Sequence, residues 1–228
     1  MITIHHLNNS RSQRILWLLE ELEIPYELKF YERDPKTMLA PKSLRDVHPL
    51  GKSPVLTDEK NTDERNTIAE SGAIIEYVLK NYGNNRLRPE QNTPEDLQYT
   101  YWLHYAEGSA MPPLVLSLIF SEAPKQPMLF FVKPIVKGFC EKVLSTYVNP
   151  QIKLNIDFME NELKNKLWFA GQEFSAADIQ ISFPLEAAAA RGSLNSNHPQ
   201  LTNFLEKIHA REAYQKALKK GGTYNLFH

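Results

Sequence analysis

Two short stretches hold residues whose types and spacing are suited to binding a small charged molecule. Residues 48–56 read His-Pro-Leu-Gly-Lys-Ser-Pro-Val-Leu, which places a lysine and a serine among two prolines and a glycine. Residues 68–75 read Ile-Ala-Glu-Ser-Gly-Ala-Ile-Ile, in which an acid and a hydroxyl stand where a helix should begin. Together they offer backbone hydrogen-bonding groups, a cation, an anion and a helix N-terminus, which attracts anions. We therefore expect a zwitterionic ligand that carries both carboxylates and an ammonium group.

The residues before these stretches are typical of a strand–helix–strand unit. Residues 2–6 and 26–31 alternate between apolar and polar types, as half-buried strands do. Between them, Ser10 and Gln13 have the spacing of a capping box, so Ser10 is expected to be the N-cap of an amphipathic helix that ends before Pro25. A helix of that length permits a right-handed crossover, and the two strands should therefore pair in parallel.

The two stretches are expected to lie on a hairpin and a helix. A short helix is predicted near residues 41–47. Residues 55–57 and 67–68 are typical of two strands, separated by a polar loop over 58–66. A helix over 70–81 follows, with apolar residues four apart on one face. The acid and the hydroxyl of the second stretch would then stand at a helix N-terminus.

Composition changes between residues 84 and 94, where Asn, Arg, Pro and Gln replace apolar residues. Such a segment is typical of a linker between domains, and no strand pattern appears beyond it. We therefore predict an α/β domain over residues 1–83, a linker over 84–94 and an all-helical domain over 95–228.

The second part shows helical patterns only. Residues 95–111 should form an aromatic-rich helix that Pro112-Pro113 either kinks or interrupts. Residues 129–163 form a second long helical stretch. Ser175 and Asp178 have capping-box spacing at the start of a further helix, and we expect their role to be structural.

Composition places the chain among ordinary globular proteins. Of its 228 residues, 42% are hydrophobic and 23% charged, and the net charge of −1 gives no general attraction to nucleic acid or anionic membranes. Cys140 is the only cysteine, which excludes an intrachain disulfide and a cysteine-based zinc site. The histidines lack metal-ligand spacing, so no metal is expected. With neither a signal-peptide pattern nor a membrane-spanning stretch, the chain is expected to be cytoplasmic.

Several motifs, in this order along the chain, resemble those of the cytosolic glutathione transferases, whose first domain is thioredoxin-like and whose second is all-helical. The matching segments are residues 48–56, 69–74 and 174–179, the last reading Phe-Ser-Ala-Ala-Asp-Ile. Residues 10–19, Ser-Arg-Ser-Gln-Arg-Ile-Leu-Trp-Leu-Leu, are similar to the first helix of serine-type members. The resemblance spans nearly the whole chain, is closest to fungal and bacterial theta-like members, and implies a glutathione transferase enzyme.

This resemblance implies how glutathione would be held. Pro54 would follow a cis peptide bond that turns the backbone of Ser53 toward the cysteinyl part of glutathione. Ser71 would bind the γ-glutamyl carboxylate and Glu70 the ammonium group, although helix capping alone also accounts for these two residue types. Lys52 would either reach the glycyl end or be a solvated lysine.

For the chemistry, the resemblance points to Ser10. The thiolate is the nucleophile, and lowering a thiol pKa of about 8.5 by two units requires roughly 2.7 kcal/mol. One charge-assisted hydrogen bond from a hydroxyl contributes about 1.5–3 kcal/mol, so a serine suffices. Ser10 is alternatively only a helix cap, and Asn9 and Ser12 are alternative donors. Glu107 would reach a ligand across a dimer interface.

The implied function is that of a homodimer in detoxification, with glutathione as co-substrate and a small hydrophobic electrophile bound in a pocket of the helical domain. A glutathione-dependent disulfide or peroxide reductase is an alternative, because the same thiolate can attack sulfur or oxygen. The third possibility is a non-catalytic interaction module that binds glutathione without turnover. The sequence does not separate these three.

Overall fold

The first part of the chain forms a four-stranded sheet. The computed structural model describes residues 1–35, 37, 39–61 and 64–226. The strands are β1 (Ile2–Leu7), β2 (Tyr26–Tyr31), β3 (Val55–Asn61) and β4 (Glu64–Ala69), in the order β2-β1-β3-β4. β1 pairs with β2 in parallel and with β3 antiparallel, as the strand–helix–strand and hairpin patterns predicted.

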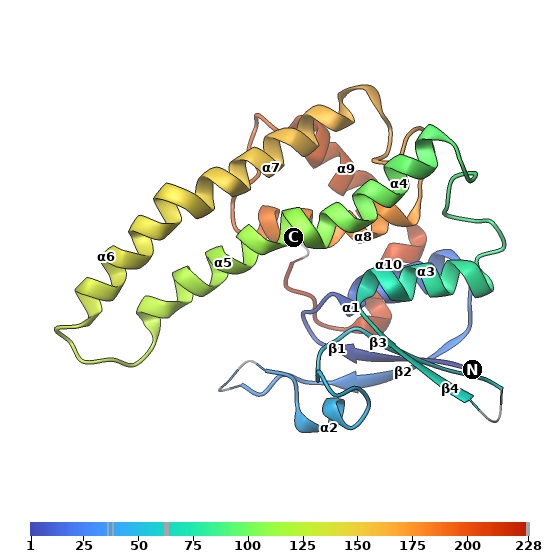
Figure 1. The fold of residues 1–228 in the computed structure, drawn as a ribbon, viewed down its shortest axis with the longest axis horizontal. Helices are drawn as coiled ribbons and strands as arrows, with labels where there is room; N and C mark the ends of the chain where they lie inside the picture. The colour runs from blue at the N-terminus through green and yellow to red at the C-terminus, as the bar shows by residue number, and fades with distance from the viewer. Residues whose placement is uncertain (36, 38, 62–63, 227–228) are drawn as a thin grey trace.

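Helices α1 (Ser12–Glu21) and α3 (Ser71–Tyr82) lie on one side of this sheet, and the short α2 (Lys42–Arg45) lies at the other (Figure 1). Residues 12–19 of α1 are all buried, among them Leu16, Leu18 and Leu19. This arrangement confirms the predicted thioredoxin-like domain.

All helices of the second part come from one continuous stretch of sequence. Two long helical segments run antiparallel, and their α5–α6 end projects from the body as an arm (Figure 1). The elements are α4 (Pro94–Tyr105), a π-helical turn (Ala106–Ala110), α5 (Met111–Glu122), a 3-10 turn (Ala123–Lys125), α6 (Lys133–Val143), a second π-helical turn (Leu144–Val148), α7 (Asn149–Glu162), a 3-10 turn (Leu163–Asn165), α8 (Ala176–Ala190), α9 (Pro199–His209) and α10 (Glu212–Gly221). No helix in the described part of the chain combines the length and apolar content needed to cross a membrane.

The observed elements complete or correct the expectations at three points, of which the polar loop over residues 58–66 was wrong. Pro112 and Pro113 fall in the first turn of α5, where a missing N–H is tolerated, and the π-helical turn Ala106–Ala110 that interrupts the regular α-helix lies directly before them. The polar loop predicted over 58–66 is largely strand: Asp58 is in β3 and buried, and its carboxylate accepts hydrogen bonds from Tyr77 and Tyr82 of α3. No pattern predicted α10.

One hydrophobic core joins the two parts of the chain. α10 packs on α1, where Trp17 and Tyr214 meet edge to face at 5.1 Å. The division of the chain at 1–83, 84–94 and 95–228 therefore stays a prediction. The buried residues of both parts belong to one hydrophobic cluster.

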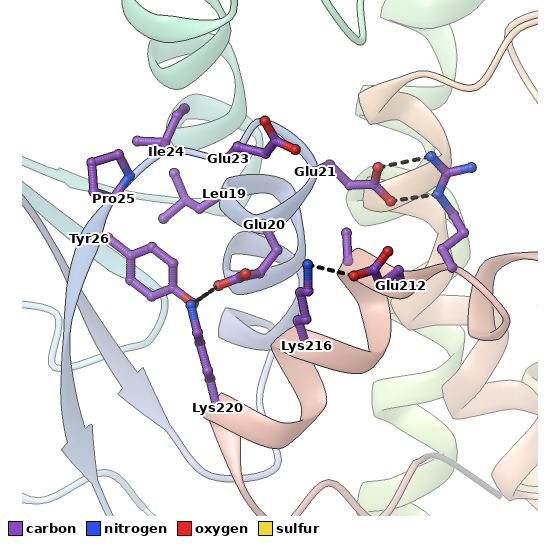
Figure 2. A pocket seen from close by; sticks show the side chains of 12 residues that line it. Leu19, Glu20, Glu21, Glu23, Ile24, Pro25, Tyr26, Glu212, Lys216 and Lys220 are labelled. Carbon is purple, nitrogen blue, oxygen red and sulfur yellow. Dashed lines mark hydrogen bonds and ion pairs between the residues drawn. The ribbon is translucent and has the colours of Figure 1, made fainter.

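Ion pairs line the outer edge of this α1–α10 contact, around an open pocket of about 770 Å³ (Figure 2). Arg211 donates to both carboxylate oxygens of Glu21, at 2.5 and 2.9 Å. Lys220 lies 2.5 Å from Glu20 and Lys216 lies 2.7 Å from Glu212. These charged side chains pair with one another, so we interpret this pocket as the boundary between two packed helices rather than as a ligand site.

Candidate functional site

The turn that contains Ser10 follows β1 and leads into α1. The capping-box prediction was wrong: α1 begins at Ser12, and its N-cap residue is Arg11. The Ser10 hydroxyl accepts from the backbone N–H of Ser12 at 3.2 Å, while neither amide atom of the buried Gln13 has a partner among the described residues. Ser10 therefore caps a tight turn one residue before the helix, and its side chain stays beside the loop that precedes β3.

Ser53 connects that loop to β1 with its side chain. Its hydroxyl donates to the carbonyl of His5 at 3.0 Å and accepts from the N–H of Leu7 at 3.3 Å. The Ser10 hydroxyl lies 3.5 Å from it. The Ser53–Pro54 bond is cis, as the resemblance implied. The structure thus brings three of the predicted residues together at the end of β1.

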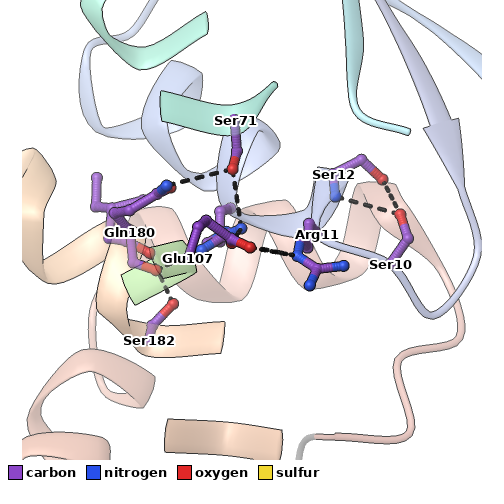
Figure 3. Close-up of polar contacts among 9 residues, drawn as sticks. Ser10, Arg11, Ser12, Ser71, Glu107, Gln180 and Ser182 are labelled. Carbon is purple, nitrogen blue, oxygen red and sulfur yellow. Dashed lines mark hydrogen bonds and ion pairs between the residues drawn. The ribbon is translucent and has the colours of Figure 1, made fainter. Parts of the chain in front are cut away.

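Ser71 is the first residue of α3 and is buried. Its hydroxyl oxygen accepts from the Arg14 guanidinium at 2.9 Å and from the Gln180 amide at 3.3 Å (Figure 3). A hydroxyl has two acceptor positions and one hydrogen, so this hydrogen remains to be donated. The first N–H groups of α3 also lack helical partners, and the start of α3 is therefore equipped to bind a carboxylate.

A cluster of three charges lies beneath the start of α3. Glu107, in the π-helical turn, accepts from Arg14 at 2.5 Å and from Arg11 at 3.0 and 3.2 Å. Burial alone would raise the pKa of Glu107, but the two guanidinium groups outweigh it and hold that pKa below its ordinary value. Two cations and one anion leave a net charge of +1, which suits one bound carboxylate. Figure 3 shows Arg11 between the serine turn and Glu107.

Arg14 has a further task in α8. Its guanidinium donates to the backbone carbonyl of Gln180. In a regular helix that carbonyl would accept from the N–H four residues on, but that residue is Pro184, which has none. Arg14 therefore supplies the hydrogen bond that Pro184 removes, and burial lowers its pKa while Glu107 raises it.

The two other predicted binding residues are exposed. Glu70 has φ of 68°, a left-handed conformation that a residue with a side chain adopts at a cost of about 1–3 kcal/mol and that clusters at functional sites. With Ser71 and Glu107 it lines a cavity of about 740 Å³. Lys52 is exposed, and within the described ranges its ammonium has no hydrogen-bond or ion-pair partner.

The remaining expectations concern Asn9, Glu107 and metals. Asn9 has φ of 49°, and its side-chain oxygen accepts from the N–H of Asn225 at 2.7 Å, so it already holds the segment after α10. The carboxylate of Glu107 is paired within its own chain, and its reach across an interface stays a prediction. No group of three or more His, Cys, Asp or Glu in the described part of the chain is arranged to hold a metal.

Sequence reasoning overlooked the residues that support the predicted ones. Arg14 precedes Leu18 and Leu22 by one and two helical turns, so a charged residue on the apolar side of a helix was the available signal. His6 is in register with Ile2 and Ile4 on the core face of β1, which is the same kind of signal. Gln180 had no signal, because only the tertiary fold brings α8 to α3.

The chain thus combines a thioredoxin-like sheet and a helical bundle with a polar site where β1 ends and α3 begins. Residues 10–80 match the family model described as "Glutathione S-transferase, N-terminal domain", and residues 125–212 match "Glutathione S-transferase, C-terminal domain". The chain therefore belongs to the glutathione S-transferase family, and the predicted enzyme class is confirmed.

Individual relatives agree. The chain is 35% identical to Glutathione S-transferase 3 of Schizosaccharomyces pombe, over 100% of this chain and 91% of that protein. It is 26% identical to Disulfide-bond oxidoreductase YfcG of Escherichia coli, over 96% and 95%. A crystal structure of a glutathione S-transferase from Actinobacillus pleuropneumoniae superimposes with a TM-score of 0.76 at 33% identity, over 100% and 99%.

Proposed function

We propose that this protein conjugates the thiolate of glutathione to small hydrophobic electrophiles, as a cytoplasmic homodimer in detoxification. The observation that carries the proposal is the position of Ser10 beside a charge cluster that leads to Ser71 (Figure 3), with Ser53 3.5 Å from the Ser10 hydroxyl. A ligand with a thiol at one end and an amino acid head at the other spans such a site.

The pose follows from the groups that remain available. The γ-glutamyl carboxylate takes the hydroxyl hydrogen of Ser71 and the N–H groups at the start of α3, above the net positive cluster. The ammonium group pairs with Glu70, and the backbone of Ser53, before the cis Pro54, pairs with the cysteinyl part. Lys52 is free to meet the glycyl carboxylate. The sulfur then lies at Ser10.

Calorimetric titration of the full chain with glutathione tests this pose. We expect saturable binding of glutathione and a large loss of affinity for cysteinylglycine, the dipeptide that keeps the thiol but lacks the γ-glutamyl head bound at Ser71. A Ser71→Ala variant should reduce the difference in affinity between glutathione and cysteinylglycine. Equal affinity for both ligands in the wild type, or no binding of glutathione, would sink the proposal.

Ser10 is the proposed catalytic residue, with Asn9 and Ser12 as the alternatives. Removing one hydrogen-bonding group from a developing anion typically lowers turnover by about 10²–10³-fold, and we expect Ser10→Ala to fall near the lower end with an aryl halide as electrophile. Ser145→Ala, an exposed serine between α6 and α7, is the matched control. Full turnover by Ser10→Ala would move the chemistry to Asn9 or Ser12.

A glutathione-dependent disulfide or peroxide reductase is the second candidate. One observation favours it, because a relative bears the name of a disulfide-bond oxidoreductase. Parallel assays with an aryl halide, a hydroperoxide and a mixed disulfide of glutathione separate the two activities. Turnover of the aryl halide at least as fast as the other two supports conjugation, and glutathione binding without any turnover would indicate a non-catalytic module.

Apolar exposure on the arm supports the homodimer. Phe130 is 87% and Ile135 is 70% exposed, and Phe131, Phe139 and Ile119 are also more than half exposed. A monomer rarely leaves so many large apolar side chains together in water, because their burial is favourable. A second copy of this chain is the proposed occupant of that surface.

A further inference from the structure

Three buried side chains, those of Ser10, Ser12 and His6, form a continuous chain of hydrogen bonds. The Ser10 and Ser12 hydroxyl oxygens lie 2.7 Å apart, and Ser12 Oγ lies 2.8 Å from Nδ1 of His6. At the far end, Nε2 of His6 lies 2.9 Å from the backbone carbonyl of Gly221 in α10. The three side chains are 5%, 0% and 2% exposed. Only Ser10 is near enough to the loop before β3 to meet a ligand.

The direction of these hydrogen bonds is set from the histidine. A carbonyl only accepts, so Nε2 of His6 carries a hydrogen and donates it to Gly221. Burial lowers the pKa of His6, which keeps the ring neutral and leaves Nδ1 without a hydrogen. Nδ1 must then accept from Ser12, and Ser12 in turn accepts from Ser10. The hydrogen of Ser10 therefore points inward.

Ser10 consequently offers a lone pair, not a hydrogen, toward a ligand. One of its acceptor positions already takes the N–H of Ser12, at 3.2 Å. Each hydroxyl also has a second and longer acceptor, the carbonyl of Leu7 at 3.3 Å for Ser12 and the Ser53 oxygen at 3.5 Å for Ser10, and the contacts of 2.8 and 2.7 Å within the chain are the shorter ones. A thiolate needs a donor, whereas a thiol can itself donate to this lone pair. The resting site is thus arranged for the protonated form of the sulfur.

We propose that the Ser10–Ser12–His6 chain takes the proton of the glutathione thiol and delivers it to Nδ1 of His6. This inference rests on the proposed binding of glutathione. The S–H bond breaks as its proton passes to Ser10, the Ser10 proton passes to Ser12, and the Ser12 proton passes to His6. One proton moves in net terms and no electrons leave the sulfur.

The same hydrogen bonds then run in the opposite direction. His6 donates from Nδ1 to Ser12, Ser12 donates to Ser10, and Ser10 donates its new hydrogen to the thiolate, while Nε2 still donates to Gly221. The imidazolium ring then stabilises the thiolate through the two hydroxyls between them, whereas in other enzymes a histidine activates a cysteine nucleophile directly. Ser10 is the catalytic residue in this scheme, and Ser12 and His6 are positioning residues that act through it.

The contacts of the His6 ring leave the glutathione thiol as the source of its second proton. The contacts of His6 are Ser12 from α1, the edge of Phe30 from β2 at a ring separation of 5.7 Å, and Gly221 from α10. Among the described residues, none that carries a charge bonds to this ring. The only anion that the proposed complex places at the end of the chain is the glutathione sulfur.

Nitrogen NMR of the histidine rings in the full chain tests the proposal directly. Without ligand, we expect His6 as the neutral tautomer with its hydrogen on Nε2. Saturating glutathione at neutral pH should convert His6 to the doubly protonated ring, whereas S-methylglutathione, which binds without a thiol proton, should leave it neutral. His6 that stays neutral in the glutathione complex overturns the relay while the proposed function stands. No binding of glutathione overturns both.

The pH dependence of kcat/KM gives a second readout. His6→Asn keeps an acceptor for Ser12 but removes the base, so its acid limb should move up by about one pH unit or more, with turnover at neutral pH lower by about tenfold or more and the KM for glutathione little changed. Ser12→Ala, which cuts the chain but leaves the ring, should show the same shift and carries the test if His6→Asn does not fold.

His5→Asn is the matched control. His5 is the next residue of β1, 1% exposed, and its ring faces the other way, toward Tyr31 and Thr57. Its pH profile should match that of the wild type. A wild-type profile in both His6→Asn and Ser12→Ala, or the same shift in His5→Asn, contradicts the relay.

Discussion

Arg14 and Pro184 illustrate how one residue of the site depends on another far along the chain. Pro184 lacks the N–H that the Gln180 carbonyl would accept in a regular helix, and the Arg14 guanidinium takes its place. The same guanidinium donates to Ser71 and Glu107. A proline inside α8 thus fixes the position of the cation beneath the start of α3.

Arg14→Met should destabilise the protein by about 2–3 kcal/mol, because the buried Gln180 carbonyl loses its donor while Glu107 keeps Arg11. The loss should be smaller in a Pro184→Ala background, where residue 184 offers its own N–H to that carbonyl. Urea unfolding of the four proteins in this double-mutant cycle measures the coupling. Arg11→Met, at a half-buried position, is the control and should change stability by less than about 1 kcal/mol. Additive effects of Arg14→Met and Pro184→Ala would contradict this account.

At the residue scale, the sequence allowed a site residue to be predicted where its neighbours form a clear helix or strand pattern. Glu70 and Ser71 were predicted because an acid and a hydroxyl preceded an apolar helix pattern, and both lie at the start of α3. The capping role of Ser10 was wrong because a tight turn through Arg11 competes with the capping box, and local spacing does not distinguish the two. His6 and Gln180 depend on α10 and α8, whose positions only the whole fold determines.

At the element scale, the capping box of α8 is the local structure that the sequence predicted most fully. Asp178 accepts from the backbone N–H of Ser175 at 2.9 Å and of Phe169 at 2.8 Å, and it is entirely buried. Despite these donors, burial raises the pKa of Asp178 to about 6. The carboxyl group therefore holds a proton in the folded protein at a pH where it would be ionised in the unfolded chain.

This shift predicts a pH-dependent stability. The folded pKa of about 6 lies above the ordinary 3.8, so the contribution is fully present below about pH 4 and is lost as the pH rises through about 6. A shift of about two pKa units corresponds to about 3 kcal/mol of stability that the wild type loses over this range. Asp178→Asn has no carboxyl group to ionise, so it should not show this loss. Urea unfolding of the wild type and of Asp178→Asn across this pH range gives the difference between their free energies of unfolding. Groups whose pKa shifts the other way, such as His6, contribute equally to both proteins and cancel in that difference. Parallel pH curves for the two proteins would refute the raised pKa.

Strands and helices of the first 83 residues were predictable because each has one buried face and therefore a clear period of two or of about 3.6 residues. The reach of β3 into the predicted polar loop was not, because Asp58 reads as a loop residue until Tyr77 and Tyr82 are placed beside it. α10 was missed because lysines dominate its sequence, although its buried residues Tyr214, Ala217 and Gly221 recur at helical spacing.

At the scale of the whole molecule, the arm formed by α5 and α6 is the surface that a second copy should cover. Ile135→Glu and Phe130→Asp place charges on it, and we expect either to shift a dimer toward monomer in sedimentation experiments. Leu167→Asp, 53% exposed beyond the far end of α7, is the matched control and should stay dimeric. A monomeric wild type, or a dimer that survives both arm substitutions, would place the interface elsewhere or remove it.

The contact between His6 and Gly221 has a consequence for the synthesis of the protein. Chains emerge from the ribosome N-terminus first, and domains generally fold in that order. Here His6 of the first strand donates a hydrogen bond to the carbonyl of Gly221 at the end of α10, and Trp17 of α1 is covered by Tyr214. The sheet can form early, but we expect the nascent protein to acquire its thiol site only after residue 221 has left the exit tunnel.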